Sequence, residues 1–369
     1  MLKLPEYPWN QLTPYRDLAA QHPQGSVDLS IGTPVDPTPT LIQEALREAS
    51  DAPGYPTTHG TLEVREAIVR WFARRRNVSA LDAADVMPTV GSKEMVAWLP
   101  LLLGLGPGDV VVRPRIAYPT YDIGATLVGA TSIATDDLNT LSAAERSALK
   151  LVWINSPGNP TGQVRSIESL RALVSQARGL GAVVASDECY AELGWGEFET
   201  GVPSVLDPQV CEGNLDNLLA LYSLSKQSNL AGYRAAFIAG APNLMPSLIN
   251  NRKHAGMIVP APVQHAMVVA LDDTAHVTAQ KDKYRARREV LRPALENFGL
   301  RIQDSEAGLY LWCTDGYSSW ETMQRLAEQG IIAGPGAFYG QAGEQHVRIA
   351  LTATDERIAQ AVQRLNTAG

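Results

Sequence analysis

A lysine directly after an apolar run is the residue of this sequence with the clearest chemical potential. Lys226 follows the run Leu218–Tyr222 and the serines Ser223 and Ser225, and Arg234 comes eight residues later. Burial disfavours the charged form of lysine, so a desolvated amine at a strand end is a good nucleophile toward carbonyl carbon. The serines and the arginine could bind a dianionic phosphate. Taken alone, the segment also fits a solvated lysine in a loop.

A carboxylate stands at the end of a second apolar run. Asp187 closes the run Ala182–Asp187, and Tyr190 follows three residues later. The carboxyl ends of strands in open α/β sheets form ligand crevices. A carboxylate there could pair with a protonated ring nitrogen and keep the ring an electron sink. A helix-capping or turn aspartate is the alternative interpretation.

Two loops add amide and backbone groups. The segment Asn155–Gly162 contains two prolines and two glycines after a predicted strand, which places Asn155 and Asn159 at the rim of a tight loop. Turn chemistry alone explains this composition, but one asparagine amide could also bond a ring oxygen. In Thr89–Lys93 a glycine-containing loop enters a predicted helix, whose free N–H groups can bind an anion. Many strand-to-helix turns share that pattern.

The elements that must position these groups alternate between short apolar runs and helical stretches. Leu41 to Arg76 is helical in pattern, with an interruption at Ala52–Gly60, and further helices are predicted at Ser92–Leu103 and Ile167–Arg178. The predicted strands are Asp109–Arg113, Thr131–Thr135, Leu149–Asn155, Ala182–Asp187, Asn217–Ser223 and Ala235–Ala239. Their nearly continuous apolar content is typical of strands covered by helices on both faces. The fold class is therefore α/β with a mostly parallel central sheet.

The second part of the chain has a different order of predicted elements. A long charged helix is predicted at about Ala270–Asn297, and a smaller α+β pattern follows it. That pattern consists of the strand Gly308–Cys313, the helix Ser319–Gln329, the strand His346–Ala350 and the helix Asp355–Asn366. The opening residues are rich in proline and polar residues and indicate an extended arm. We expect residues 1–40 to form an N-terminal arm that joins the small domain, residues 41–275 a large domain and residues 276–369 a small C-terminal domain.

Composition excludes several classes of function. The 369 residues carry a formal charge of −8, so no general basic surface for nucleic acid exists. The first residues lack a signal-peptide pattern, and the apolar stretch around Val96–Leu105 is too short to span a membrane. Cys189, Cys211 and Cys313 fit neither a disulfide framework nor a zinc site. We expect a cytoplasmic protein without a metal site.

In this order and spacing, the strings NSPGNPTG, SDECY and SLSKQSNLAGYR resemble those of the fold-type I, class I/II aminotransferases, which depend on pyridoxal 5′-phosphate (PLP). The resemblance covers essentially the whole chain. It implies the PLP-dependent transferase fold of the aspartate aminotransferase type. It also implies a homodimer with shared active sites, small-molecule amino acid and 2-oxo acid substrates, and no nucleic-acid or membrane partner.

The resemblance assigns a role to each motif. Lys226 matches the lysine that carries PLP as a Schiff base and moves the α-proton, and Asp187 matches the partner of the pyridine nitrogen. Tyr190 and Asn159 match the groups that bond the ring's 3′-oxygen, and Tyr118 matches the aromatic ring that stacks on the pyridine. The phosphate ligands correspond to Gly91, Ser92, Lys93, Ser223, Ser225 and Arg234.

The substrate side is assigned in the same way. Arg348 matches the arginine that binds the substrate α-carboxylate, a task that suits a guanidinium fork, and Gly32 would approach that carboxylate from the opposite side. Tyr55 matches a tyrosine that reaches the phosphate of the neighbouring subunit. The chain departs from the family at Ile116, where members often have proline two residues before the stacking tyrosine.

The implied activity is amino transfer between an amino acid and a 2-oxo acid by a ping-pong mechanism. The segments LSIGTP, GSKE and SLSKQSNLAGYR are most similar to those of N-succinyldiaminopimelate aminotransferases of lysine biosynthesis. A distal substrate carboxylate then needs a cation, and the resemblance implies that the basic cluster Asn251–Met257 approaches the neighbouring subunit's active site. Arg252, Lys253 and His254 are the candidates there, and Lys253 is preferred for its long reach. Compensation of a helix dipole is the alternative reason for that cluster.

Other activities stay open or are disfavoured. A broad or aromatic/aspartate-type aminotransferase and a PLP β-lyase would use the same lysine and aspartate. A non-catalytic PLP-binding regulator is disfavoured because only a short arm precedes the large domain. A nicotinamide dehydrogenase is disfavoured because Gly104–Asp109 ends in aspartate where a dinucleotide motif needs glycine, and because it precedes a strand.

Overall fold

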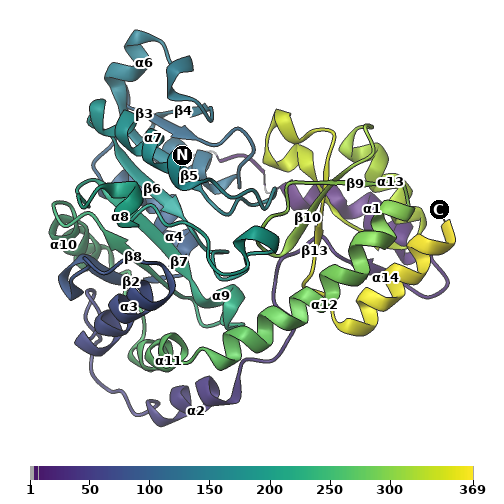
Figure 1. Cartoon of the computed structure of the whole chain (residues 1–369), viewed down its shortest axis with the longest axis horizontal. Helices are drawn as coiled ribbons and strands as arrows, with labels where there is room; N and C mark the ends of the chain where they lie inside the picture. Colours follow the sequence, from purple (N-terminus) through teal and green to yellow (C-terminus); the bar gives the residue numbers. More distant parts are fainter. Residues whose placement is uncertain (1–3, 7, 369) are drawn as a thin grey trace.

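The computed structural model describes residues 4–6 and 8–368, so parts of the predicted arm (residues 1–3 and 7) and residue 369 lie outside the described residues. Its large sheet consists of β2 (Val86–Val90), β3 (Val110–Arg113), β4 (Thr131–Ala134), β5 (Leu149–Asn155), β6 (Val183–Asp187), β7 (Leu218–Ser223) and β8 (Ala235–Gly240). The strand order is β2-β8-β7-β6-β5-β3-β4 (Figure 1). From β7 to β4 all neighbours are parallel, whereas β8 is antiparallel to both β7 and β2. The predicted α/β class with a mostly parallel sheet is confirmed.

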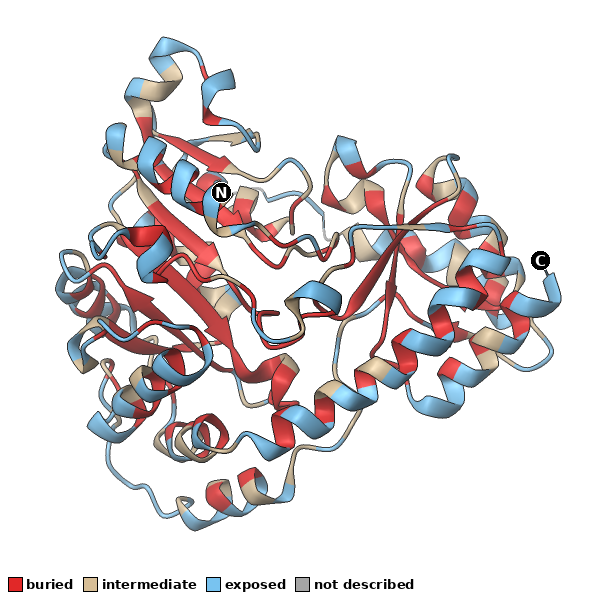
Figure 2. Cartoon of the chain, in the orientation of Figure 1, coloured by how far each residue is buried: buried red, intermediate tan, exposed pale blue. Residues whose placement is uncertain are grey.

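Helices cover both faces of this sheet. Every residue of β7 and β8 is buried, and Figure 2 shows the central strands as a continuous buried band. The covering helices explain why these strands are apolar along their whole length instead of alternating. The helices of this part of the chain, which pack on the sheet or, like α2 and α8, on another helix, are α2 (Thr40–Glu48), α3 (Leu62–Arg75), α4 (Ser92–Leu102), α5 (Thr120–Val128), α6 (Ala143–Ala148), α7 (Ile167–Gly179), α8 (Pro208–Cys211), α9 (Leu224–Gln227), α10 (Met245–Ala255) and α11 (Ala261–Asp272).

The edge strand β2 is absent from the strands that the sequence predicts. It contains Pro88, which has no N–H for a sheet ladder and so weakens the strand signal. The strand is tolerated here because it lies at the end of the sheet, where it has only β8 as a neighbour.

The long charged helix predicted at about Ala270–Asn297 is present, but the first residues of that range belong to a separate helix. The chain forms α11, which ends at Asp272, and then α12 (Ala275–Asn297). Asp273 adopts an extended conformation between them, and its carboxylate accepts a hydrogen bond from the backbone N–H of His276 at 2.9 Å. A polar side chain that satisfies free N–H groups at a helix start competes with helix continuation, and this competition separates the two helices.

A smaller antiparallel sheet forms the core of the C-terminal part. It has the order β12-β13-β10-β9, and α12 runs from beneath the large sheet toward it (Figure 1). Its strands are β9 (Arg301–Gln303), β10 (Tyr310–Thr314), β12 (Gly334–Pro335) and β13 (Val347–Ala350), and the accompanying helices are α13 (Ser319–Glu328) and α14 (Asp355–Ala368). The expected strands and helices of this region are thereby confirmed. The limits of the two domains stay a prediction.

The N-terminal segment is not an extended arm, contrary to the prediction. A 3₁₀ helix at Pro8–Leu12 leads into α1 (Thr13–Ala20), and β1 (Val27–Asp28) pairs in parallel with β11 (Ile331–Ile332). Leu12 is fully buried in the same apolar cluster as the small sheet. Burial of this apolar face stabilises a helix that the proline-rich local sequence does not predict.

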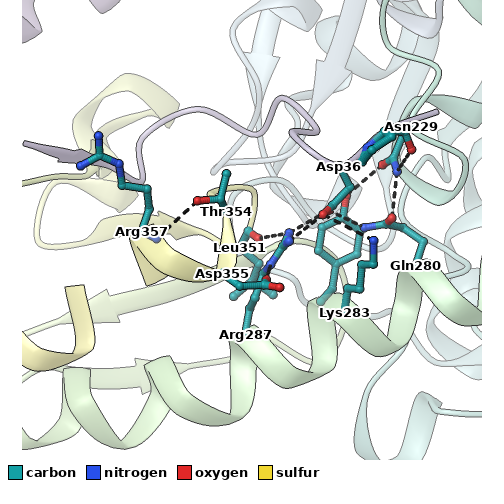
Figure 3. Close-up of polar contacts among 11 residues, drawn as sticks. Asp36, Asn229, Gln280, Lys283, Arg287, Leu351, Thr354, Asp355 and Arg357 are labelled. Atoms are coloured by element: carbon teal, nitrogen blue, oxygen red, sulfur yellow. Dashed lines mark hydrogen bonds and ion pairs between the residues drawn. The ribbon is translucent and has the colours of Figure 1, made fainter. Parts of the chain in front are cut away.

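An ionic network joins the N-terminal segment, α12 and the start of α14 (Figure 3). The guanidinium of Arg287 donates to both carboxylate oxygens of Asp36 at 2.7 and 2.8 Å and to Asp355 at 2.6 Å. Gln280 also donates to Asp36 at 2.9 Å, and it accepts from Asn229 at 2.8 Å. Asn229 follows α9, so the network connects the small domain with the chain segment that carries the predicted reactive lysine.

No helix formed by residues 4–6 and 8–368 combines the length and the apolarity that crossing a membrane would require.

Candidate active site

A cavity of about 460 Å³ lies where the two sheets and the N-terminal segment meet. The ends of β5, β6 and β7 contribute Asn155, Asp187 and Ser223 to its wall. Because parallel strands end at the same edge of a sheet, residues far apart in sequence converge there. Of the predicted site residues, the lining includes Gly32, Ser92, Lys93, Tyr118, Asn159, Asp187, Tyr190, Ser223, Ser225, Lys226, Arg234 and Arg348.

Lys226 lies on the short helix α9, directly after β7. Its ammonium group donates to the backbone carbonyl of Gly32 at 2.5 Å. Burial lowers the pKa of Lys226, and the nearby cations Arg348 and Arg234 lower it further. A larger share of neutral amine makes Lys226 a better nucleophile and a better base at neutral pH.

Asp187 is held at the end of β6 by two donors. Tyr121 donates its hydroxyl to Oδ2 at 2.9 Å, and the backbone N–H of Cys189 donates to Oδ1 at 3.2 Å. Burial raises the pKa of Asp187 even though these hydrogen bonds favour the carboxylate. A buried carboxylate of this kind interacts strongly with a cationic nitrogen placed beside it, because little water screens the pair.

A cradle for an anion forms beside α9. Ser223 donates its hydroxyl to that of Ser225 at 2.8 Å, and the exposed Arg234 flanks them. Gly91 has a φ of +78° and precedes α4 without any side-chain cap, so the N–H groups that begin at Ser92 have no capping oxygen. A Cβ at Gly91 would lie 1.9 Å from a guanidinium nitrogen of Arg234. Glycine thus lets the guanidinium lie close to the start of α4, and hydroxyl, guanidinium and helix N–H groups gathered in this way suit a phosphate.

Arg348 stands on β13 on the other side of the cavity and is buried. Its guanidinium donates to the side-chain oxygen of Asn159 at 2.9 Å and to the backbone carbonyl of Ser30 at 2.6 Å. Its Nε is buried and has no hydrogen-bond partner among the described residues. The guanidinium also lies 4.0 Å from the ring centre of Tyr310. A buried cation with a donor to spare is suited to a carboxylate ligand.

Tyr310 on β10 is a site residue that the sequence analysis missed. Its hydroxyl lies 3.3 Å from that of Tyr190, and a Cβ at Gly32 would meet it at 1.9 Å. Burial by itself would raise the pKa of Tyr310, but the neighbouring cations Arg348 and Lys226 lower it. The register of β10 with β13 brings this phenol to the site, and no local motif signals that register.

Two further groups on the cavity wall come from elements that the sequence did not assign to the site. Trp9 and Arg16 belong to the N-terminal segment and line the cavity beside Tyr118. The ring of Trp9 lies 6.4 Å from that of Tyr118. Lys93 donates to the Tyr118 hydroxyl at 3.2 Å, so the predicted stacking residue is held from both sides.

The asparagines of the predicted loop have different surroundings. The Asn155 amide donates to the carbonyls of Pro157 and Asp187, both at 3.0 Å, and its oxygen accepts from the backbone of Asn159. Asn155 therefore holds the loop on the strand end. Asn159 keeps its side chain toward Arg348, at the place where cofactor and substrate are expected to meet.

Tyr55 and Lys253 do not belong to this cavity. The Tyr55 side chain is 101% exposed, and Lys253 is exposed near the end of α10. Both were predicted to act in a neighbouring subunit's site, so their roles stay predictions.

The residues around the cavity fit PLP. The amine of Lys226 is close enough to both Arg348 and Arg234 for their charges to lower its pKa, and Asp187 lines the same cavity and is available to a ring nitrogen. The close approach of the Arg234 guanidinium to Gly91, at the uncapped start of α4, is the observation that makes a phosphate fit, since a β-carbon would displace that guanidinium.

Known proteins resemble the chain along nearly its whole length. The model of the family "aminotransferase class I and II" matches residues 24–365. The 4-dedimethylamino-4-oxo-anhydrotetracycline transaminase OxyQ of Streptomyces rimosus is 53% identical over 99% of this chain and 100% of its own. The LL-diaminopimelate aminotransferase of Aquifex aeolicus is 33% identical over 98% and 96%.

Solved structures agree with the sequence matches. That of a probable N-succinyldiaminopimelate aminotransferase of Thermus thermophilus is similar with a TM-score of 0.86 at 29% identity, over 98% of this chain and 100% of that one. An aminotransferase of Neisseria meningitidis has a TM-score of 0.88 at 29% identity, over 99% and 97%. With its fold, cavity and these relatives together, the chain belongs to the class I and II aminotransferases and depends on pyridoxal 5′-phosphate.

Proposed function

We propose that this aminotransferase moves an amino group between N-succinyl-LL-2,6-diaminopimelate and the 2-oxoglutarate/glutamate pair, by a ping-pong mechanism. The observation that carries the proposal is the union, in one cavity, of a buried amine (Lys226), a buried carboxylate (Asp187) and a buried guanidinium (Arg348) with an anion cradle. We further propose a cytoplasmic homodimer in which Tyr55 reaches the neighbouring subunit's phosphate.

The cofactor would be held by residues already described. Ser223, Ser225, Arg234 and the N–H groups at Ser92 would bind its phosphate, and Tyr118 would cover its ring. When bound, PLP supplies a carbonyl for the amine and a ring that takes up the electrons released at the substrate α-carbon.

The reacting residues each have one task. Arg348 binds the substrate α-carboxylate and thereby orients the α-hydrogen toward Lys226. Lys226, with its lowered pKa, would accept that proton from the α-carbon and pass it to the cofactor within the same half of the reaction. In the second half it would move a proton in the reverse direction, to the α-carbon derived from the 2-oxo acid. Asp187 keeps the ring nitrogen protonated through a buried charge pair, and Tyr121 keeps Asp187 in place. Tyr190 and Asn159 donate toward the ring oxygen.

The substrate proposal is supported by two relatives whose names include diaminopimelate, at 33% and 29% identity. A second candidate has a stronger sequence match. OxyQ is 53% identical over 99% of the chain, which favours amination of a ring ketone like that in OxyQ's name. Both reactions would use the same Lys226, Asp187 and anion cradle, so only the acceptor or donor distinguishes them.

The test is a substrate comparison with the purified holoenzyme. N-succinyl-diaminopimelate with 2-oxoglutarate should give the largest kcat/KM, above that of aspartate, aromatic amino acids and the tetracycline-type ketone with glutamate. A preference for the ring ketone would replace the first candidate by the second. Pyruvate release from sulfur amino acids, without glutamate formation, would indicate a β-lyase.

A chemical test addresses the lysine separately. Borohydride should attach the cofactor to the peptide that contains Lys226, and Lys226→Ala should abolish turnover while cofactor can still bind noncovalently. Reduced cofactor on another lysine would refute the assignment.

A further inference from the structure

The cavity wall carries more positive charge than the cofactor and one α-carboxylate require. Asp187 is the acidic residue of the lining. The basic residues are Arg16, Lys93, Arg234 and Arg348, together with Lys226, whose amine is the reacting group and is left out of the charge balance. A cavity with this charge balance favours ligands with several negative groups.

Four of these cations already have hydrogen-bond partners within the protein. Lys226 donates to the Gly32 carbonyl, and Arg348 donates to Asn159 and Ser30. Arg234 donates to the Ala231 carbonyl beside the cradle, and Lys93 donates to Tyr118. Each of the four is therefore oriented by the protein itself.

The remaining cation is Arg16 on α1. It is partly buried, it lines the cavity, and no hydrogen bond or ion pair joins its guanidinium to any residue within 4–6 and 8–368. A half-buried cation without a protein partner loses solvation without compensation, so an anionic ligand gains more there than on the open surface.

The cavity wall that includes Arg16 also carries apolar side chains. Trp9, Ile31 and Tyr118 contribute to the same wall, and Ile31 is 45% exposed although it is a large aliphatic residue. Trp9 is fixed by the ring of Phe338 at 5.3 Å. Apolar side chains and a cation on the wall of one cavity suit an aliphatic stem that ends in a carboxylate.

We propose that Arg16 binds the distal carboxylate of the substrate, so that the enzyme's substrate class is amino acids and 2-oxo acids with a second, side-chain carboxylate. Arg348 binds one end of such a molecule and Arg16 the other, within one subunit. The inference rests on the proposed function, because it takes Arg348 as the α-carboxylate site. It places distal recognition on α1, whereas the sequence had suggested Lys253 of a neighbouring subunit.

One guanidinium then serves both halves of the ping-pong reaction. Glutamate, 2-oxoglutarate and N-succinyl-diaminopimelate all carry a carboxylate beyond the reacting carbon. A single flexible cation at the end of an apolar wall accommodates stems of different length more easily than a rigid bidentate site does.

The experiment compares ligands that differ only in the distal charge. Glutarate and glutaramate are titrated by calorimetry into the holoenzyme, the Arg16→Gln and Arg16→Lys variants, and Arg47→Gln, which removes an exposed arginine of α2 as a matched control. Losing a charge-assisted hydrogen bond should weaken glutarate binding roughly 10- to 150-fold in Arg16→Gln, with less than about a twofold change for glutaramate. Arg16→Lys should retain part of the selectivity, and Arg47→Gln all of it.

Kinetics provide the second readout. The kcat/KM for L-glutamate should fall by a similar factor in Arg16→Gln, whereas that for L-glutamine should stay nearly constant. Equal losses for both members of each pair would show that Arg16 only shapes the wall, and no loss would remove it from the site. A loss of selectivity in Lys253→Ala instead would move distal recognition to α10.

The two proposals fail in different ways. Glutarate binding needs no amino transfer, so the binding comparison still tests Arg16 if none of the proposed donors reacts. Normal transfer with unchanged glutarate selectivity in Arg16→Gln would overturn the assignment of Arg16 alone.

Discussion

Replacing Arg287 with alanine should destabilise the protein, because that arginine neutralises a carboxylate that water scarcely reaches. The Arg287 and Asp36 side chains are 3% and 10% exposed, and two hydrogen bonds of 2.7 and 2.8 Å join them (Figure 3). Asp355, the second partner of Arg287, has a side chain that is 73% exposed. The same guanidinium therefore makes one buried and one exposed ion pair, and the two should contribute differently to the free energy of unfolding.

The expected magnitudes follow from this difference. Removing one partner of a buried ion pair costs about 3–5 kcal/mol, because the other charge stays buried without compensation. An exposed pair contributes at most about 1 kcal/mol. With an unfolding entropy of roughly 2.1 cal/mol/K per residue and 369 residues, Arg287→Ala should lower the unfolding midpoint by about 4–6 °C. Asp355→Asn should lower it by no more than about 1.5 °C.

Calorimetric unfolding of the holoenzyme between pH 3 and 8 measures these shifts. Burial would raise the pKa of Asp36, but hydrogen bonds from Arg287 and Gln280 lower it below its ordinary value. Its contribution to stability is then complete above the unfolded pKa of about 3.9 and is lost as the pH falls through the lower folded pKa. The difference between the parent protein and Asp36→Asn should therefore be constant from pH 5 to 8 and shrink below about pH 4. Equal midpoints for Arg287→Ala and Asp355→Asn would refute the argument from burial, and an Asp36→Asn difference that stays constant down to pH 3 would refute the argument from charge.

Three further substitutions test the site. Asp187→Asn should slow amino transfer by at least about 100-fold, since an amide cannot keep the ring nitrogen protonated, while the cofactor affinity measured by equilibrium dialysis should change much less. Near-normal turnover would make Asp187 a turn residue. Gly91→Ala should weaken cofactor binding about tenfold or more in the same dialysis assay, because its Cβ would lie 1.9 Å from a guanidinium nitrogen of Arg234; unchanged affinity would contradict the cradle. Gly32→Ala should reduce kcat/KM about tenfold at unchanged cofactor content, because the new Cβ would lie 1.9 Å from the Tyr310 hydroxyl; a loss of cofactor instead would place Gly32 in the cofactor site.

The sequence by itself determined the α/β fold, the PLP dependence and the residues at the ends of the large sheet's strands. Apolar runs that end in polar residues identify strands whose carboxyl ends share one edge, so Asn155, Asp187 and Ser223 had to converge once the sheet was parallel. The order of the motifs then predicted Lys226 as the reactive lysine without any geometric information. Local patterns suffice for such residues because the strand end itself fixes their position.

Other features were decided only by the tertiary structure. Tyr310 enters the site through the register between β10 and β13, and register depends on which faces are buried, not on a local motif. Arg16 reaches the cavity because α1 and the turn before it bury Leu12 and Ala19 against the small domain. The same contact between distant parts of the chain explains why the prediction of an extended arm was wrong. The break between α11 and α12 likewise depends on a side chain, Asp273, that competes for backbone N–H groups. In each case the stabilising energy comes from contacts between distant segments, or from a local competition for hydrogen bonds that hydrophobic periodicity does not show. These features are therefore visible only in the folded chain.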